Sequence, residues 1–168
     1  MNRMRATLSA SAARRRAGVR DDPLRARRRG PCVASDCGGG ANGFVDIPDS
    51  LSGEVKARQP LSDTNSPTAY QVTVEVGTIG GDRRGWARIS SGDPVNNPVR
   101  KHAKVWMDWR APQSPIQPWL QCGPFEVRHD GLTATSAAKR TDPSPAWQFR
   151  ACGSMELPGS PVYCTDWW

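Results

Sequence analysis

The stretch PAWQFRACGSMELPGSPVYCTDWW, residues 145–168, decides the fold of this chain. Its two ends, 146–152 and 161–168, carry aromatic and β-branched residues, and a proline-glycine pair between them reverses the chain. If the two segments pair as a hairpin in the right register, Cys152 and Cys164 come within disulfide-bridging range. We therefore predict a closing β-hairpin with a Cys152–Cys164 disulfide, which also shelters the tryptophan pair at its end.

Alternation of apolar and polar residues continues this pattern toward the N-terminus. In AYQVTVEVG (69–77), Tyr70 and the valines at 72, 74 and 76 share one face, as in a half-buried strand. The chain contains 16 glycines and 15 prolines, which favour short elements joined by turns. Strands are expected at 85–90, 101–110, 118–122, 124–129 and 132–136, and more weakly near Val55, with one helical turn at 135–140.

These elements predict an all-β domain over residues 44–168, an antiparallel β-sandwich of about seven or eight short strands. No apolar run approaches the roughly 18–20 residues that cross a bilayer, so no membrane span is expected. The seven tryptophans all lie in the second half of the chain, and most are expected in the core because each indole buries a large apolar area.

Residues 1–30 differ from the rest in charge. They carry ten arginines and two aspartates, which is +8, whereas residues 31–168 carry 13 basic and 14 acidic side chains, which is −1. Few large apolar residues accompany the arginines, so residues 1–43 are expected to form a disordered arm and a glycine-rich linker. The arm is the segment expected to bind nucleic acid, or else it is a tail without a ligand. The candidate phosphate contacts are Arg14, Arg15, Arg16, Arg27, Arg28 and Arg29.

Five cysteines leave one unpaired or bonded to another chain. Cys122 is expected to bond to Cys32 or Cys37, or to remain free. Zinc is disfavoured because Cys32 and Cys37 have no second ligand pair at a matching spacing, so we expect no metal and no cofactor.

A disulfide-stabilised, helix-poor body is typical of oxidising compartments, which predicts an extracellular protein. Residues 1–30 lack the apolar run of a signal peptide, so a wrongly assigned start or an organelle presequence are the explanations that remain open for this segment.

Three patterns that could carry catalysis are weak. His129-Asp130 adjoins a turn glycine, and Asp108 and Glu126 form a carboxylate pair only if the fold brings them together. The loop GTIGGDRRG (77–85) lacks the lysine and helix of a phosphate-binding loop, and is better explained as a hairpin turn. We expect that the protein is not an enzyme.

Two aromatic residues are better placed for binding. Trp106 shares its strand face with Lys104, Asp108 and Arg110, and Trp119 lies among prolines in SPIQPWLQ. Exposed indoles beside polar groups suit a glycan, a peptide or a partner protein, so Trp106 and Trp119 are the candidate ligand-binding aromatics.

The segments GWARI (85–89), WLQCGPF (119–125), WQFRACG (147–153) and YCTDWW (163–168) resemble a group of small uncharacterised secreted proteins of actinobacteria. The residues that carry the resemblance are Gly85, Trp86, Cys122, Arg150, Ala151, Cys152, Gly153, Cys164, Trp167 and Trp168. It implies secretion and a β-sandwich and no particular chemistry. The resulting expectation is a secreted, disulfide-stabilised, non-enzymatic binding or structural protein, with an unknown protein or glycan as ligand and nucleic-acid binding by the arm as the alternative.

Overall fold

In the computed structural model the chain divides into two units, Met1–Gly30 and Pro31–Trp168. The structure describes residues 36–62, 70–110, 119–155 and 159–168, all of them in the second unit. The first 35 residues of the expected arm, with its six clustered arginines and Cys32, lie outside the described residues, as do 63–69, 111–118 and 156–158.

A six-stranded antiparallel sheet forms one layer of the second unit. Its longest members, β3 (Tyr70–Ile79) and β4 (Asp82–Ser91), are joined by a two-residue turn in which Gly80 and Gly81 have φ angles of 60° and 87°. This turn is the 77–85 loop, and it is the hairpin that the glycines favour. The remaining strands are β1 (Phe44–Val45), β8 (Ala138–Arg140) and β2 (Glu54–Pro60), in the order β1-β8-β4-β3-β2, with β7 (Ala134–Thr135) paired to β4.

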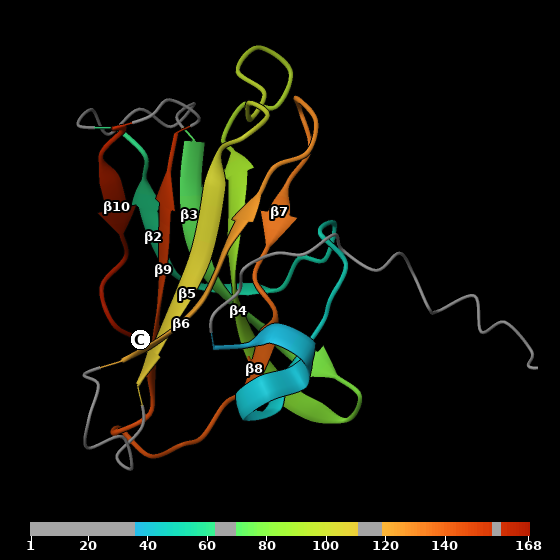
Figure 1. Cartoon of the computed structure of the whole chain (residues 1–168), viewed down its shortest axis with the longest axis vertical. Helices are drawn as coiled ribbons and strands as arrows, with labels where there is room; N and C mark the ends of the chain where they lie inside the picture. The colour runs from blue at the N-terminus through green and yellow to red at the C-terminus, as the bar shows by residue number, and fades with distance from the viewer. Residues whose placement is uncertain (1–35, 63–69, 111–118, 156–158) are drawn as a thin grey trace, which may run out of the picture. The chain divides into compact units, whose positions relative to one another are not determined.

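A four-stranded antiparallel sheet forms the other layer, in the order β10-β9-β5-β6. Its strands are β10 (Val162–Cys164), β9 (Gln148–Ser154), β5 (Lys104–Arg110) and β6 (Leu120–Glu126). The expected strands at 118–122 and 124–129 are one strand, because the Gly123-Pro124 step is absorbed as a register shift against β5. In Figure 1 the sheet that contains β5 and β6 overlies the sheet that contains β3 and β4.

The core lies between the two sheets, and small or branched residues supply most of it. Val72 and Val74 of β3 meet Val105 of β5 and Phe149 of β9, and all four are at most 1% exposed. The sheets approach so closely that a Cβ on Gly153 would lie 2.6 Å from Cγ1 of Val72. The predicted antiparallel β-sandwich is therefore confirmed, with ten strands among the described residues where seven or eight were expected.

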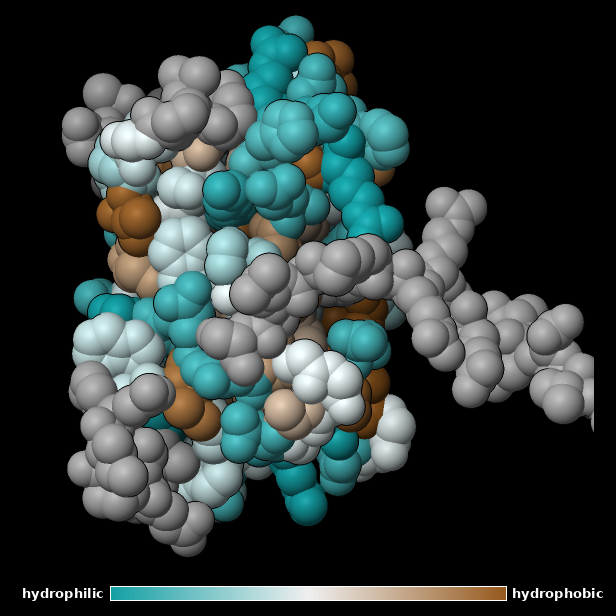
Figure 2. Space-filling model, in the orientation of Figure 1, coloured by the Kyte–Doolittle hydropathy of each residue, from teal (hydrophilic) through white to brown (hydrophobic). Residues whose placement is uncertain are grey.

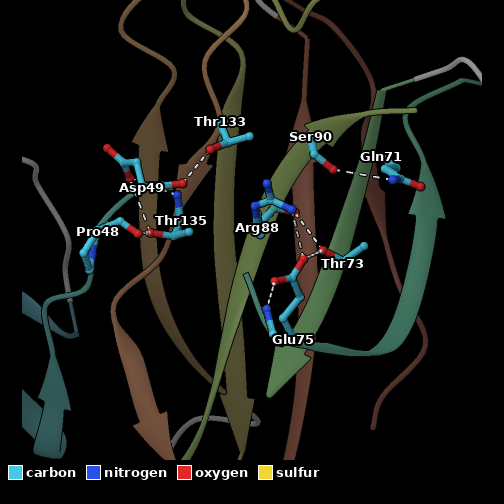
Figure 3. Close-up of polar contacts among 10 residues, drawn as sticks. Pro48, Asp49, Gln71, Thr73, Glu75, Arg88, Ser90, Thr133 and Thr135 are labelled. Atoms are coloured by element: carbon cyan, nitrogen blue, oxygen red, sulfur yellow. Dashed lines mark hydrogen bonds and ion pairs between the residues drawn. The ribbon is translucent and has the colours of Figure 1, made fainter. Parts of the chain in front are cut away.

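The outer side of the six-stranded sheet is closed by residues 45–53. Trp86 is 1% exposed there, in a small cluster with Ile47 and Ala138. Polar contacts fix the same segment (Figure 3): Glu75, also buried, accepts from the Gly53 N–H at 2.8 Å and from Arg88 at 3.3 Å. These buried charges are paired and hydrogen-bonded, as a stable position requires.

The prediction of a helical turn at 135–140 is wrong. The Ser136 N–H donates to the Ala87 carbonyl and the Ser136 hydroxyl accepts from the Ala87 N–H, both at 2.9 Å. Flanking residues belong to β7 and β8, so pairing with β4 overrides the local helix propensity of TSAAKR.

The expectation that most tryptophans are buried is also wrong. Only Trp86 and Trp109 are buried, at 1% and 8% exposure. Trp119 and Trp168 are 40% and 36% exposed, and the other three are half-buried. The terminal pair is therefore packed against the domain without being enclosed by it.

The described residues contain two disulfides. Cys152 and Cys164 face each other across the β9–β10 pair with their Cα atoms 4.1 Å apart, which is the pair expected from the closing hairpin. Cys122 bonds to Cys37, one of its two expected partners. Cys37 directly precedes a short 3₁₀ segment, η1 (Gly38–Gly43), so these residues, expected to form a linker, are attached to the sandwich.

Removing each disulfide should cost stability according to the chain it closes. The separations are 12 residues for Cys152–Cys164 and 85 for Cys37–Cys122, so the chain-entropy relation gives about 2.8 and about 4.6 kcal/mol. We expect the Cys37→Ala/Cys122→Ala double variant to unfold at a lower urea concentration than the Cys152→Ala/Cys164→Ala double variant. Equal loss in both variants would contradict the loop-length argument.

Candidate functional site: an arginine–tryptophan face

The outer face of the four-stranded sheet carries the polar and aromatic residues of β5 and β9. Strand alternation turns Trp106, Asp108 and Arg110 away from the core, while Val105, Met107 and Trp109 point into it. The β5–β9 register places Asp108 opposite Arg150 and Trp106 opposite Cys152. Side chains distant in the sequence therefore meet on one face.

Arginine and tryptophan side chains stack on this face. The guanidinium carbon of Arg150 lies 5.0 Å from the ring centre of Trp119 and 4.7 Å from that of Trp167. Arg110 lies 4.5 Å from the Trp167 ring centre, and the two indoles are 6.4 Å apart and inclined by 61°. Such distances are those of cation–π contacts. We call these four residues the Arg–Trp stack: Trp119, Arg150, Trp167 and Arg110.

Asp108 forms an ion pair with Arg150 on the sheet side of the Arg–Trp stack. Its Oδ2 accepts from Nε of Arg150 at 2.8 Å and from Nη2 at 2.7 Å, and the residue is only 2% exposed. Its Oδ1 is buried and has no hydrogen-bond partner among the described residues. Loss of hydration raises the pKa of Asp108, and the hydrogen bond and charge of Arg150 oppose this rise. The ion pair fixes Arg150 between the two indoles.

The stability contributed by Asp108 should depend on pH. Because the pKa of Asp108 is raised above its ordinary value of 3.8, the folded chain keeps a proton over a pH range in which the unfolded chain has lost it. Its contribution therefore falls as pH rises from 3.8 through the folded-state pKa. We expect the free energy of unfolding of the native protein, minus that of Asp108→Asn, to fall over this range in urea titrations. A difference that grows with pH would show that Arg150 outweighs the loss of hydration.

Both aromatic residues selected from the sequence lie in this sheet, in different surroundings. Trp119 belongs to the Arg–Trp stack and is 40% exposed. Trp106 is half-buried, and a Cβ on Gly123 would lie 2.6 Å from its own Cβ, so it packs against the β6 backbone. Arg110, Arg150 and Trp167 were not selected. For Arg110 and Arg150 the signal is the polar alternation of β5 and β9, which becomes informative only once the register is known. Trp167 follows β10, and only the fold shows that it meets both arginines.

A cleft of about 390 Å³ adjoins the stack at one end of the sandwich. Gln148 contacts both the stack and the cleft. Its Oε1 accepts from Nε of Arg110 at 2.6 Å, and its side chain lines the cleft. Trp168 follows Trp167 directly and lies in the cleft, stacked on Phe149 with the ring centres 6.2 Å apart. The lining residues are Arg83, Thr141, Asp142, Pro143, Ser144, Pro145, Trp147, Gln148, Phe149 and Trp168.

Trp147 forms one wall of the cleft, and the side chain of Lys139 packs between it and two other aromatic rings. The Nζ atom of Lys139 lies 4.6 Å from the Trp109 ring centre and 5.7 Å from those of Trp147 and Phe44. Burial, and secondarily the charge of Arg84, lowers the pKa of Lys139. This cation connects the core indole of Trp109 to the cleft and fixes Trp147.

The patterns considered for catalysis are not assembled into a site. Asp130 accepts from the Lys101 N–H at 2.7 Å and faces Arg100 at 3.7 Å, so it stabilises a loop contact. Glu126 lies opposite Lys104 in the β5–β6 register, whereas Asp108 lies opposite Gln121, so the two carboxylates occupy different positions along the sheet.

One group in the described part of the chain has the composition of a metal site. Ligand atoms of Asp108, Cys152 and Cys164 lie within 4.8 Å of one another. The two sulfur atoms are bonded to each other, so neither is a thiolate that could hold a metal.

Among the described residues no helix has the length and apolarity to cross a membrane.

Comparison with known proteins gives no match. No protein-family model fits the chain, and no curated protein or solved structure resembles it at a significant level.

Proposed function

We propose that this chain is a secreted, disulfide-stabilised, non-enzymatic binding protein whose ligand contacts the Arg–Trp stack. The observation that carries the proposal is the exposure of Trp119 within a stack that is already ordered by Arg150 and Asp108. Tryptophan and arginine are the residues most enriched at binding hot spots. Side chains fixed before binding lose little conformational entropy when the ligand arrives.

The surface chemistry favours recognition of a partly polar ligand. Figure 2 shows hydrophilic and intermediate residues interleaved over this side of the molecule, with hydrophobic residues scattered among them. Arg110 is exposed and contributes a cation beside the indoles. The paired charges of Asp108 and Arg150 cancel, so the stack offers aromatic faces together with one free positive charge.

Secretion is supported by the two disulfides. Disulfides persist in extracellular and periplasmic compartments and are rare where thiol reductants are abundant. Cys37–Cys122 closes a large part of the domain, and Cys152–Cys164 fixes the strand that leads to Trp167. An oxidising compartment preserves both.

Truncation of Trp119 tests the binding role. We expect Trp119→Ala to lower affinity by about 30-fold for the best-bound member of an array of glycans and peptides, the usual effect of removing a hot-spot indole. The control is Leu132→Ala, which removes an apolar side chain that is 51% exposed in a turn away from this face. The proposal is wrong if no member of the array has a higher affinity for the native protein than for the Trp119→Ala variant.

The charge of residues 1–30 favours a second function, the binding of nucleic acid by the arm. Ten arginines against two aspartates give this segment +8 in a chain whose remainder is −1. Arginines that neutralise phosphates release counterions, so each contributes about −0.9 to the slope of log K against log salt.

Deletion of residues 1–30 separates this function from that of the sandwich. We expect the full chain to bind a double-stranded oligonucleotide with a steep salt dependence, and the shortened chain to lose this binding while it keeps its unfolding midpoint. Fluorescence anisotropy at several salt concentrations measures both chains. Equal binding by the two chains would contradict an arm-based function.

A further inference from the structure

We propose that the Cys152–Cys164 disulfide exchanges with small thiols that attack Cys164, and that Asp108 supplies the proton that Cys152 takes up as the disulfide opens. This exchange is independent of the proposed function, because it needs no ligand on the Arg–Trp stack. The reacting partner is a low-molecular-weight thiol, and the first product is a mixed disulfide at Cys164. The carrying observation is a contact of 3.6 Å between Sγ of Cys152 and Oδ2 of Asp108.

The two halves of this disulfide have different surroundings. Cys152 is 0% exposed and lies in β9, with β5 on one side and β10 on the other. Cys164 ends β10, the outermost strand of its sheet, and is half-buried. Exchange begins at the sulfur that the incoming thiolate can reach. The new bond therefore forms to Cys164, and Cys152 is the sulfur that leaves.

The sulfur that leaves faces a buried carboxyl group. Asp108 is 2% exposed, and ligand atoms of Asp108, Cys152 and Cys164 all lie within 4.8 Å of one another. A thiolate on Cys152 would form where water does not hydrate it, so its charge is costly unless a proton neutralises it. A protonated Asp108 provides that proton within the same cluster.

Asp108 is placed to hold a proton before the disulfide opens. Its Oδ2 accepts from Arg150, whereas its Oδ1 is buried and has no hydrogen-bond partner among the described residues. Loss of hydration raises the pKa of Asp108, and Arg150 opposes this rise. A proton on Oδ1 leaves the contact with Arg150 in place.

Most of the charged groups around Asp108 are positive. From β9, Nη2 of Arg150 lies 2.7 Å away, and Arg110 lies two residues further along β5. From β6, the opposite residue is the uncharged Gln121, whose backbone N–H donates to the carboxylate of Asp36 at 2.9 Å. From β10 comes the disulfide itself. Arg150 can therefore hold the Asp108 carboxylate that remains once its proton has gone.

Opening forms one bond, breaks one bond and moves one proton. The sulfur of the incoming thiolate bonds to Cys164, the Cys152–Cys164 bond breaks, and its electron pair stays on Cys152. Asp108 gives its proton to Cys152 and becomes a carboxylate. Attack of Cys152 on the mixed disulfide reverses these events: the proton returns to Asp108 and the external thiolate leaves.

The strands stay paired when the disulfide opens. The Thr165 N–H donates to the Ala151 carbonyl at 2.9 Å, and Phe149 and Trp168 exchange two backbone hydrogen bonds of 2.8 Å. These bonds flank the cysteines and do not depend on the S–S bond. Cys152 and Cys164 therefore remain opposite each other, and the folded chain can close the disulfide again.

Asp108 should make the opening depend on pH in two ways. Below its folded-state pKa it is protonated and gives its proton to Cys152. Above that pKa its negative charge opposes the thiolate that forms beside it, and Arg150 offsets part of this effect. Asp108→Asn has neither the acidic proton nor the charge. The variant should therefore open more slowly than the native protein in acid and faster near neutrality.

Reduction kinetics with mass spectrometry test the exchange. The full chain carries Cys32→Ser, so that the two described disulfides supply every trapped thiol. Glutathione with acid quenching identifies the attacked sulfur, and a water-soluble phosphine, which also opens disulfides in acid, gives rates from about pH 3 to about pH 8. We expect glutathione on Cys164, and opening of Cys152–Cys164 at least about tenfold faster than of Cys37–Cys122, whose cysteines are 3% and 0% exposed.

Replacement of Asp108 gives the second readout. We expect Asp108→Asn to open about 100-fold more slowly than the native protein at the acid end and about tenfold faster near neutral pH. Asp166→Asn removes an exposed carboxylate just after the same strand and should follow the native protein at every pH. A variant that unfolds would open both disulfides faster together, so the Cys37–Cys122 rate identifies unfolding, and the native measurements then decide.

Three results would overturn the exchange site. They are glutathione on Cys152, slower opening of Cys152–Cys164 than of Cys37–Cys122, and a native-to-variant rate ratio for Asp108→Asn that does not change with pH. None of them bears on the proposed function, which depends on ligand binding by Trp119.

Discussion

The pairing of β9 with β5 is the constraint on which the candidate site depends. It places Asp108 opposite Arg150, and on the other side of β9 it leads into the disulfide between Cys152 and Cys164. A slip of one residue would turn Arg150 into the core and Phe149 out of it, because strand side chains alternate between the two faces. The register that packs the core is therefore the same register that assembles the Arg–Trp stack.

The ion pair under the stack is better explained by positioning than by stability. Burying Asp108 and Arg150 costs hydration that their attraction only partly recovers, and the free Oδ1 of Asp108 adds to this cost. A guanidinium held by a carboxylate at its edge keeps its flat faces available, and here these faces meet Trp119 and Trp167. The structure thus maintains an ordered aromatic surface at some expense of stability.

The sequence reveals the layers of this fold more readily than its surface. Alternation in 69–77 and 101–110 identified the inward faces of β3 and β5, and the cysteine spacing identified the closing hairpin. Alternation is local, so it could not show that β9 pairs with β5 or that Arg150 would meet Trp119. It also could not show that Ser136 pairs with Ala87, which removes the helical turn expected at 135–140. Long-range pairing decided each of these features.

The composition of the core explains why the tryptophans are found outside it. Valine, alanine and a few larger residues such as Met107 and Phe149 fill the space between two closely approaching sheets. Gly153 leaves no room for a side chain at that interface, and an indole there would need still more space. Trp86 and Trp109 are accommodated at positions where the packing allows a large ring. Of the other five indoles, Trp119 and Trp167 stack on arginines, and Trp147 and Trp168 line the cleft. Trp106 packs against the β6 backbone, so none of the five takes a fully enclosed position between the sheets.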